Sequence, residues 1–162
     1  MSTIVIGIAD LNVVKAPDKI TTLGLGSCCG VALYDKANKI CGMVHVMLPS
    51  AAKATDNANK AKFADSGILL LLERMQQAGA RRMGLTAKLA GGASMFAANG
   101  TMQSDLLRVG ERNVQVCKEM LGKLRIPILA EDVLGTHGRT VTFDPATGLL
   151  HIKTVGMGEK DI

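Results

Sequence analysis

The stretch Cys28–Pro49, CCGVALYDKANKICGMVHVMLP, holds two apolar runs on either side of a short polar turn. Such a pattern is typical of a β-hairpin, and we expect strands at Cys28–Tyr34 and Ile40–Leu48, with Asp35 opposite Ile40. Directly opposed residues then share a face, and a shift by one residue would mix the two faces. One face carries Cys29, Val31, Leu33, Val44, Val46 and Leu48, and the other carries Cys28, Gly30, Ala32, Tyr34, Cys41, Met43, His45 and Met47.

The segments around this hairpin show further strand and helix patterns. Apolar residues recur at helical spacing in Ala61–Gln77 and Val109–Leu124, which predicts two helices. Two helices among about eight strands predict an α/β or α+β sandwich, and 162 residues predict a single domain over residues 1–162. The other strands are expected at Thr3–Ala9, Ile20–Leu25, Met83–Ala90, Ile126–Ala130, Thr140–Phe143 and Leu149–Thr154.

The composition excludes several classes of protein. Apolar residues make up 48% of the chain, enough for a packed core, which excludes a disordered protein. Aromatic residues make up only 2%, so the chain offers almost no surface on which bases can stack. The formal net charge is +5, but the Lys and Arg residues are scattered and no helix-turn-helix signature is present. We therefore expect no nucleic-acid partner.

The hydropathy pattern predicts a cytoplasmic protein. The run Ile68–Leu72 has five apolar residues, far fewer than the roughly 20 that cross a bilayer, so no membrane insertion is expected. The segment Met1–Ile8 lacks the basic start and the apolar length of a signal peptide.

The four cysteines, at positions 28, 29, 41 and 117, are expected to be free thiols in such a compartment. A zinc site that combines them with His45 is not expected. On one strand, Cys41 and His45 would lie about 13 Å apart at ~3.3 Å per residue, whereas two ligands of one zinc lie ~3–4 Å apart. We predict no metal.

The register of the hairpin suggests a catalytic pair. His45 lies opposite Gly30, which has no side chain, and Cys28 is its diagonal neighbour, while Cys29 points into the core. An imidazole that takes the proton of a thiol creates a nucleophilic thiolate and an imidazolium that lowers the thiol pKa. Cys is also among the most buried residue types, so a packing contact is the alternative explanation of the same spacing.

Several blocks of the sequence together resemble the CheD family, the chemoreceptor glutamine deamidases of bacterial and archaeal chemotaxis. The first two blocks are TLGLGSC (22–28) and GMVHVMLP (42–49), which contain both members of the pair. The resemblance covers essentially the whole chain and departs at Cys29, where the family usually has a small apolar residue. The other blocks are KFAD (62–65), AGGASMF (90–96), GERN (110–113), AED (130–132), GR (138–139) and TG (147–148).

The resemblance implies a three-layer sandwich with mixed sheets, similar to the catalytic domains of deamidating toxins. It implies Cys28 as nucleophile, His45 as base and Thr22 as the third member, with no cofactor. The expected partners are chemoreceptor cytoplasmic helices and a CheC-type phosphatase. Phe96 is either an exposed anchor for a partner or part of the core.

The implied reaction is deamidation of receptor glutamines through a thioester. Backbone N–H groups of Gly26, Ser27 and Cys28 are the candidates to stabilise the oxyanion. A non-catalytic adaptor of a CheC-type phosphatase is the alternative function, and a cysteine peptidase would use the same pair of residues.

Overall fold

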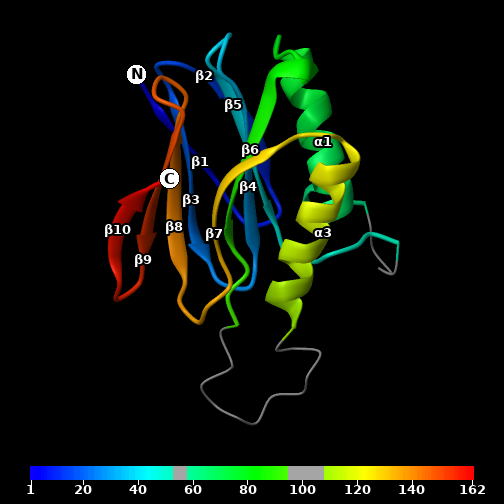
Figure 1. The fold of residues 1–162 in the computed structure, drawn as a ribbon, viewed down its shortest axis with the longest axis vertical. Helices are drawn as coiled ribbons and strands as arrows, with labels where there is room; N and C mark the ends of the chain where they lie inside the picture. Colours follow the sequence, from blue (N-terminus) through cyan, green and yellow to red (C-terminus); the bar gives the residue numbers. More distant parts are fainter. Residues whose placement is uncertain (53–57, 95–107) are drawn as a thin grey trace.

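The structure is a computed structural model that describes residues 1–52, 58–94 and 108–162, arranged in three layers (Figure 1). Two sheets lie face to face, and two helices cover the far side of one of them. The strands are β1 (Thr3–Ile6), β2 (Leu11–Lys15), β3 (Lys19–Leu25), β4 (Cys29–Asp35), β5 (Ile40–Val46), β6 (Leu85–Gly91), β7 (Ile128–Val133), β8 (Arg139–Asp144), β9 (Leu149–Thr154) and β10 (Gly158–Asp161). The helices are α1 (Ala64–Gln77) and α3 (Val109–Lys123), with short 3-10 turns η1 (Lys60–Lys62) and η2 (Arg82–Gly84).

Each sheet has five strands and mixed pairing. The strand order is β1-β3-β8-β9-β10 in the outer sheet and β2-β5-β4-β6-β7 in the middle sheet. One pair in each sheet is parallel, β1 with β3 and β6 with β7, and the other pairs are antiparallel. The expected α+β sandwich of mixed sheets with two main helices is therefore confirmed.

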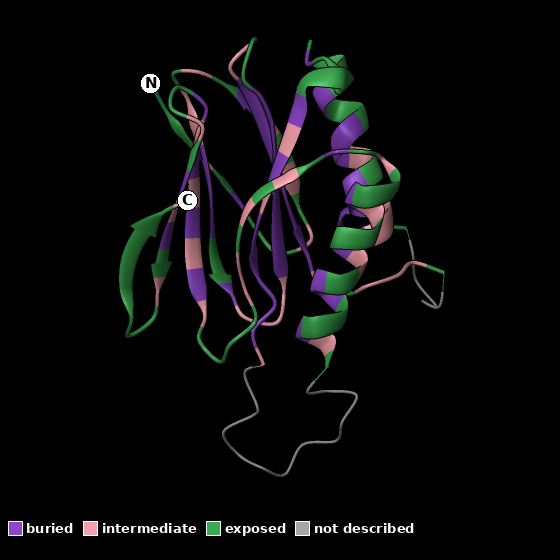
Figure 2. Cartoon of the chain, in the orientation of Figure 1, coloured by how far each residue is buried: buried purple, intermediate pink, exposed green. Residues whose placement is uncertain are grey.

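The central hairpin has the register expected from its apolar alternation. Asp35 pairs with Ile40, Gly30 with His45 and Cys29 with Val46. Every residue of β4 and β5 is buried, because the middle sheet has a layer on both faces (Figure 2). The apolar core against the helices includes Cys29, Val31, Leu33, Val44 and Val46, whereas the core between the sheets includes Ala32, Tyr34, Cys41 and Met43.

The helices cover the middle sheet through one apolar stripe each. In α1 the buried residues include Ile68, Leu71 and Met75, which pack against the hairpin. The helix begins at Ala64 rather than at the expected Ala61, because Phe63 has an extended backbone and pairs with Leu48 in an isolated bridge. The buried stripe of α3 consists of Gly110, Asn113, Val114, Cys117 and Leu121.

The strands β2 and β10 were not expected from the sequence. Both lie at the edge of a sheet. In β2 only Val14 is buried, and in β10 all four residues are exposed, so neither strand has the apolar alternation that sequence patterns reveal. Their pairing partners, β5 and β9, hold them in place.

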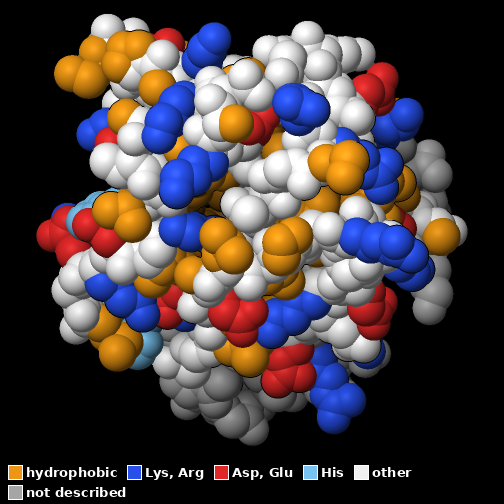
Figure 3. Space-filling view, turned by 45° about the horizontal axis from the view of Figure 1, so that its top comes forward, with side chains coloured by type: hydrophobic (Ala, Val, Ile, Leu, Met, Phe, Trp, Pro, Cys, Tyr) orange, Lys and Arg blue, Asp and Glu red, His pale blue; other side chains and the backbone are white. Residues whose placement is uncertain are grey.

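The surface carries its positive charge in a dispersed form. On the face drawn in Figure 3, Lys and Arg side chains are interspersed with apolar and acidic ones and form no continuous stripe. Within the described ranges, no helix is both long enough and apolar enough to cross a membrane.

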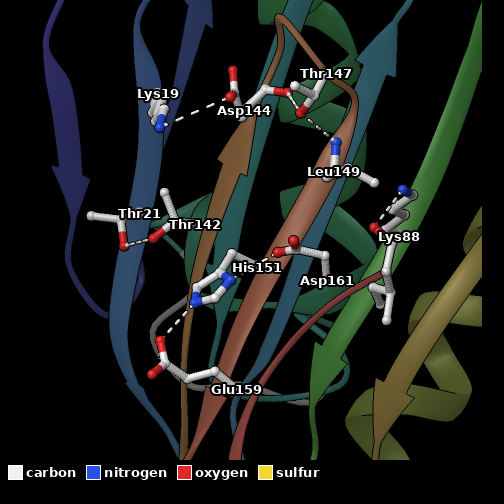
Figure 4. A network of polar contacts seen from close by, with 11 residues as sticks. Lys19, Thr21, Lys88, Thr142, Asp144, Thr147, Leu149, His151, Glu159 and Asp161 are labelled. Atoms are coloured by element: carbon white, nitrogen blue, oxygen red, sulfur yellow. Dashed lines mark hydrogen bonds and ion pairs between the residues drawn. The ribbon is translucent and has the colours of Figure 1, made fainter.

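The edge strand β10 is attached to β9 by a histidine between two carboxylates (Figure 4). His151 Nδ1 lies 2.8 Å from Asp161 Oδ1, and its Nε2 lies 2.8 Å from Glu159 Oε1. The hydrogen bonds to Glu159 and Asp161 raise the pKa of His151 above its ordinary value of 6.5. The attachment is therefore strongest when His151 carries its proton.

We predict that this contact makes stability depend on pH. Because the folded-state pKa is raised, the contribution is fully present below about pH 6.5 and is lost as the pH rises through the folded pKa. Its size is below about 1 kcal/mol, since the groups are exposed and screened by solvent. Urea unfolding of the wild type and of His151→Gln should differ more at about pH 6 than at about pH 9, and a difference that grows over this range would contradict the prediction.

Candidate active site

The candidate residues lie on β3, on β5 and just before the start of β4. Thr22 comes from β3 of the outer sheet and His45 from β5 of the middle sheet, and both are fully buried between the sheets. Cys28 lies one residue before β4 and is half-buried. The two sheets thus contribute different members of the site.

Thr22 binds the imidazole of His45 directly. The hydroxyl Oγ1 of Thr22 donates to the carbonyl oxygen of Ile6 at 3.0 Å and lies 2.7 Å from His45 Nδ1. A hydroxyl has one hydrogen, and Ile6 accepts it, so His45 Nδ1–H must donate to Thr22. The lone pair of the neutral ring is therefore on Nε2, the nitrogen that a general base would use.

His45 Nε2 is buried, and it has no hydrogen-bond partner among the described residues. Burial lowers the pKa of His45 to about 4, so the ring is neutral near pH 7. The backbone is fixed as well, because His45 accepts from Ala9 N–H at 2.9 Å and donates to Asp10 O at 3.0 Å. The ring is thus oriented through Nδ1, and its Nε2 retains a lone pair that could accept a proton.

The position over Gly30 is filled rather than empty. A Cβ atom built on Gly30 would lie 3.1 Å from Leu25 Cδ1, and Leu25 is fully buried. The sequence suggested that the missing side chain of Gly30 clears a path between Cys28 and His45. Instead, a methyl group of Leu25 packs there and helps to exclude water from this part of the site.

Cys28 is held by the turn that follows β6. Gly92 N–H donates to Cys28 O at 2.8 Å, and Ala93 N–H donates to Gly26 O at 2.9 Å. Gly91 has a φ of +102°, and a Cβ at this position would overlap the carbonyl of Cys28. The segment Gly91–Ser94 is thus the tight strand exit that shapes the site.

The resting pair is neutral, which differs from the thiolate–imidazolium pair suggested by the sequence. Burial, followed by the nearby Cys29 thiol, raises the pKa of Cys28, and burial lowers the pKa of His45. Since Nε2 has no partner, no hydrogen bond joins it to Cys28 Sγ in this structure. Both shifts arise because the groups are withdrawn from water without a countercharge beside them.

The remaining three cysteines lie in the interior of the fold. Cys29, Cys41 and Cys117 are buried, as the sequence predicted for Cys29. Cys29 and Cys117 belong to the same core, between the middle sheet and the helices. In the described ranges, no three His, Cys, Asp or Glu side chains gather as a metal-ligand set. Phe96 lies outside the described residues.

Asn113 lies near the site, and the sequence analysis assigned it no function. It is fully buried on α3, and its Nδ2 donates to Ser27 O and to Met47 O, each at 2.9 Å. The sequence does indicate that Asn113 is buried, because it lies four residues before Cys117 and eight before Leu121, on the apolar stripe of the helix. An amide on a buried stripe has to find partners.

The sequence matches a family model and is similar to named bacterial proteins. The family model described as CheD chemotactic sensory transduction matches residues 47–154. The chain belongs to the CheD family. A protein of Lachnoclostridium phytofermentans named "Probable chemoreceptor glutamine deamidase CheD" is 55% identical over 157 residues, which cover 97% of this chain and 96% of that protein. A protein of Clostridium botulinum with the same name is 52% identical, with the same coverage.

Similarity to solved structures is weaker. The crystal structure of Bacillus licheniformis hypothetical protein YfiH resembles this CheD-family chain with a TM-score of 0.48 and 14% identity, over 78% of this chain and 51% of that one.

We predict that Gly91→Ala displaces Cys28. The new Cβ would overlap the Cys28 carbonyl, and alanine is strained at a φ of +102°. Stability should fall by at least about 1 kcal/mol, and labelling of Cys28 by iodoacetamide should change in rate. Gly84→Ala is the matched control, because a Cβ there would meet no atom within 4 Å. Labelling of Cys28 at the wild-type rate in Gly91→Ala would contradict the prediction.

Proposed function

We propose that this CheD-family chain converts glutamine side chains of chemoreceptors to glutamate and releases ammonia. The observation that carries the proposal is the buried Nε2 of His45, which has no partner and lies on a ring oriented by Thr22. Cys28 is half-buried and lies two residues before Gly30, the residue that pairs with His45. The names of the relatives support the choice of substrate.

The first half of the reaction forms a thioester. His45 Nε2 accepts the proton of the Cys28 thiol as sulfur attacks the carbonyl carbon of the glutamine carboxamide. The imidazolium then gives this proton to the amide nitrogen, the C–N bond breaks and ammonia leaves. The acyl group remains on sulfur.

The second half hydrolyses the thioester. His45 takes a proton from water, whose oxygen attacks the acyl carbon, and the C–S bond breaks. Cys28 recovers its proton from the imidazolium, and the side chain leaves as glutamate. Because the resting thiol and imidazole are both neutral, His45 acts as a general base during attack rather than as the partner of a standing thiolate.

The oxyanion of both intermediates needs donors near Cys28. In the part of the chain that the structure describes, no backbone hydrogen bond of a turn or loop has the N–H of Ser27 or Cys28 as its donor. These two groups, with Gly26 N–H, are our candidates for an oxyanion hole.

Binding of a CheC-type phosphatase stays a prediction from the family resemblance, and a cytoplasmic location stays a prediction from the hydropathy pattern. Adaptor, peptidase and deamidase functions give different products from a receptor cytoplasmic fragment. Mass spectrometry should detect conversion of glutamine to glutamate in an uncleaved fragment. A cleaved backbone would indicate a peptidase, and an unchanged fragment would favour the adaptor.

The two adjacent cysteines give a direct test of the nucleophile. Cys28→Ala should abolish ammonia release and leave the fold intact, because the half-buried thiol is removed without opening the core. Cys29→Val should keep activity and cost less than about 1.5 kcal/mol, since it replaces one small apolar group by another in the core. An inactive Cys29→Val together with an active Cys28→Ala would contradict the prediction, because the nucleophile would then be Cys29, which points to the opposite face of the sheet.

We predict that the ionisation of His45 sets the acid limb of the reaction. Activity requires the neutral ring, and the pKa of about 4 keeps kcat/KM level as the pH falls until it approaches that value. His45→Ala should reduce activity by about 10²–10⁴-fold. An acid limb near 6.5, the ordinary value for histidine, would contradict a buried neutral base.

Thr22 variants then test the orientation of the ring. Thr22→Val keeps the shape but removes the acceptor of Nδ1–H, and activity should fall about 10–100-fold because an unsatisfied buried donor costs about 1–3 kcal/mol. Thr22→Ser keeps the hydroxyl and should retain activity. Equal losses in the two variants would indicate packing rather than the hydrogen bond.

A further inference from the structure

The two strand ends that carry the catalytic pair are joined by a side chain from another layer. The antiparallel ladder of β4 and β5 ends at the pair Cys29 and Val46. Beyond it, Met47 and Leu48 N–H both donate to Lys62 O, so the chain after β5 turns toward η1 and away from β4. Backbone bonds therefore stop holding the two strands together just where Cys28 lies.

Beyond the end of the β4–β5 ladder, the side chain of Asn113 on α3 links the two backbone segments. Its Nδ2 donates one hydrogen to Ser27 O, in the residue before Cys28, and the other to Met47 O, two residues after His45. Both bonds are 2.9 Å, and the side chain is fully buried. One planar NH₂ group thus fixes the separation of the two backbone segments.

The orientation of the Asn113 carboxamide is determined by its partners. A flip would place Oδ1 against two carbonyl oxygens, which are acceptors and cannot donate to it. Oδ1 therefore faces the other way, where it is buried and no group in the described ranges donates to it. Leaving a buried acceptor unsatisfied is unfavourable, so the residue is not the choice that best stabilises the fold.

We propose that Asn113 is a positioning residue that sets the geometry between Cys28 and His45. It touches neither reacting atom. It acts through the carbonyls of Ser27 and Met47, so that the Cys28 thiol can reach His45 Nε2 when the proton is transferred. The inference rests on the proposed function, because it assigns a positioning role within that catalytic pair.

Two variants remove the bridge in different ways. Asn113→Ala removes both donors, and Asn113→Asp keeps the shape but has at most one hydrogen for the two carbonyls. Both should lower kcat for a receptor fragment about 100-fold, because a misplacement of about 1 Å can have this effect, while KM changes little. Leu121→Ala is the matched control, since it opens the same buried stripe of α3 away from Ser27 and Met47.

A double-mutant cycle with His45→Ala separates positioning from simple stability. The measured quantity is the rate of iodoacetamide labelling of Cys28, which does not depend on any glutamine substrate. If Asn113 acts through the Cys28–His45 pair, His45→Ala should slow labelling in the wild type but change it little in the Asn113→Ala background. The inference would be overturned if the effects of His45→Ala and Asn113→Ala on the labelling rate simply multiply in the double variant. It would also be overturned if the Asn113 variants lose no more kcat than Leu121→Ala.

The two hypotheses fail in distinguishable ways. A wild-type protein that releases no ammonia from receptor fragments would reject deamidation, whereas the labelling cycle would still decide the role of Asn113. Labelling that His45→Ala leaves unchanged in the wild type would overturn the positioning role, whatever the substrate.

Discussion

The hydrogen bond between Thr22 Oγ1 and His45 Nδ1 joins the two sheets at the point where the chemistry is expected. It links β3 of the outer sheet to β5 of the middle sheet, and the same hydroxyl also donates to Ile6 on β1. Because the Thr22 hydrogen goes to Ile6, the tautomer of His45 is fixed by the backbone of a third strand. The packing of the sandwich thus decides which imidazole nitrogen is available, and any sliding of the sheets would remove the base.

Burial of this bond determines how the pair can work. With the ring fully buried, the pKa of His45 falls to about 4, and the same withdrawal from water raises the pKa of Cys28. In the resting protein, burial disfavours both the thiolate of Cys28 and the imidazolium of His45, since no opposite charge offsets the loss of hydration. In the proposed reaction, charge then develops only while the thiol attacks, when the thiolate and imidazolium would form next to each other. A site of this kind keeps its thiol protonated between turnovers, which makes it less reactive toward oxidants and alkylating agents.

Sequence alone was sufficient for the hairpin because its two faces differ along their whole length. The apolar residues at 29, 31, 33, 44 and 46 define one register, and the structure has that register. Patterns of this kind describe single elements, so they say nothing about which residues of two sheets touch. The Thr22 bond came from the family resemblance, and the packing of Leu25 over Gly30 was not expected. The edge strand β10 has no buried residue and therefore no pattern to detect.

Three hydrogen bonds hold the short segment Gly26–Cys28, and they come from two different parts of the fold. The turn after β6 binds the carbonyls of Gly26 and Cys28, while α3 binds that of Ser27 through Asn113. The turn is itself attached to β8, because Arg139 donates to Gly91 O at 3.3 Å and pairs with Asp132 at 3.0 Å. All three carbonyls of the segment are thereby directed into the protein. Since the peptide units are planar, this arrangement limits where their N–H groups can point. A loop held in this way has its backbone donors set before substrate arrives, which is the condition under which an oxyanion hole stabilises charge without reorganisation.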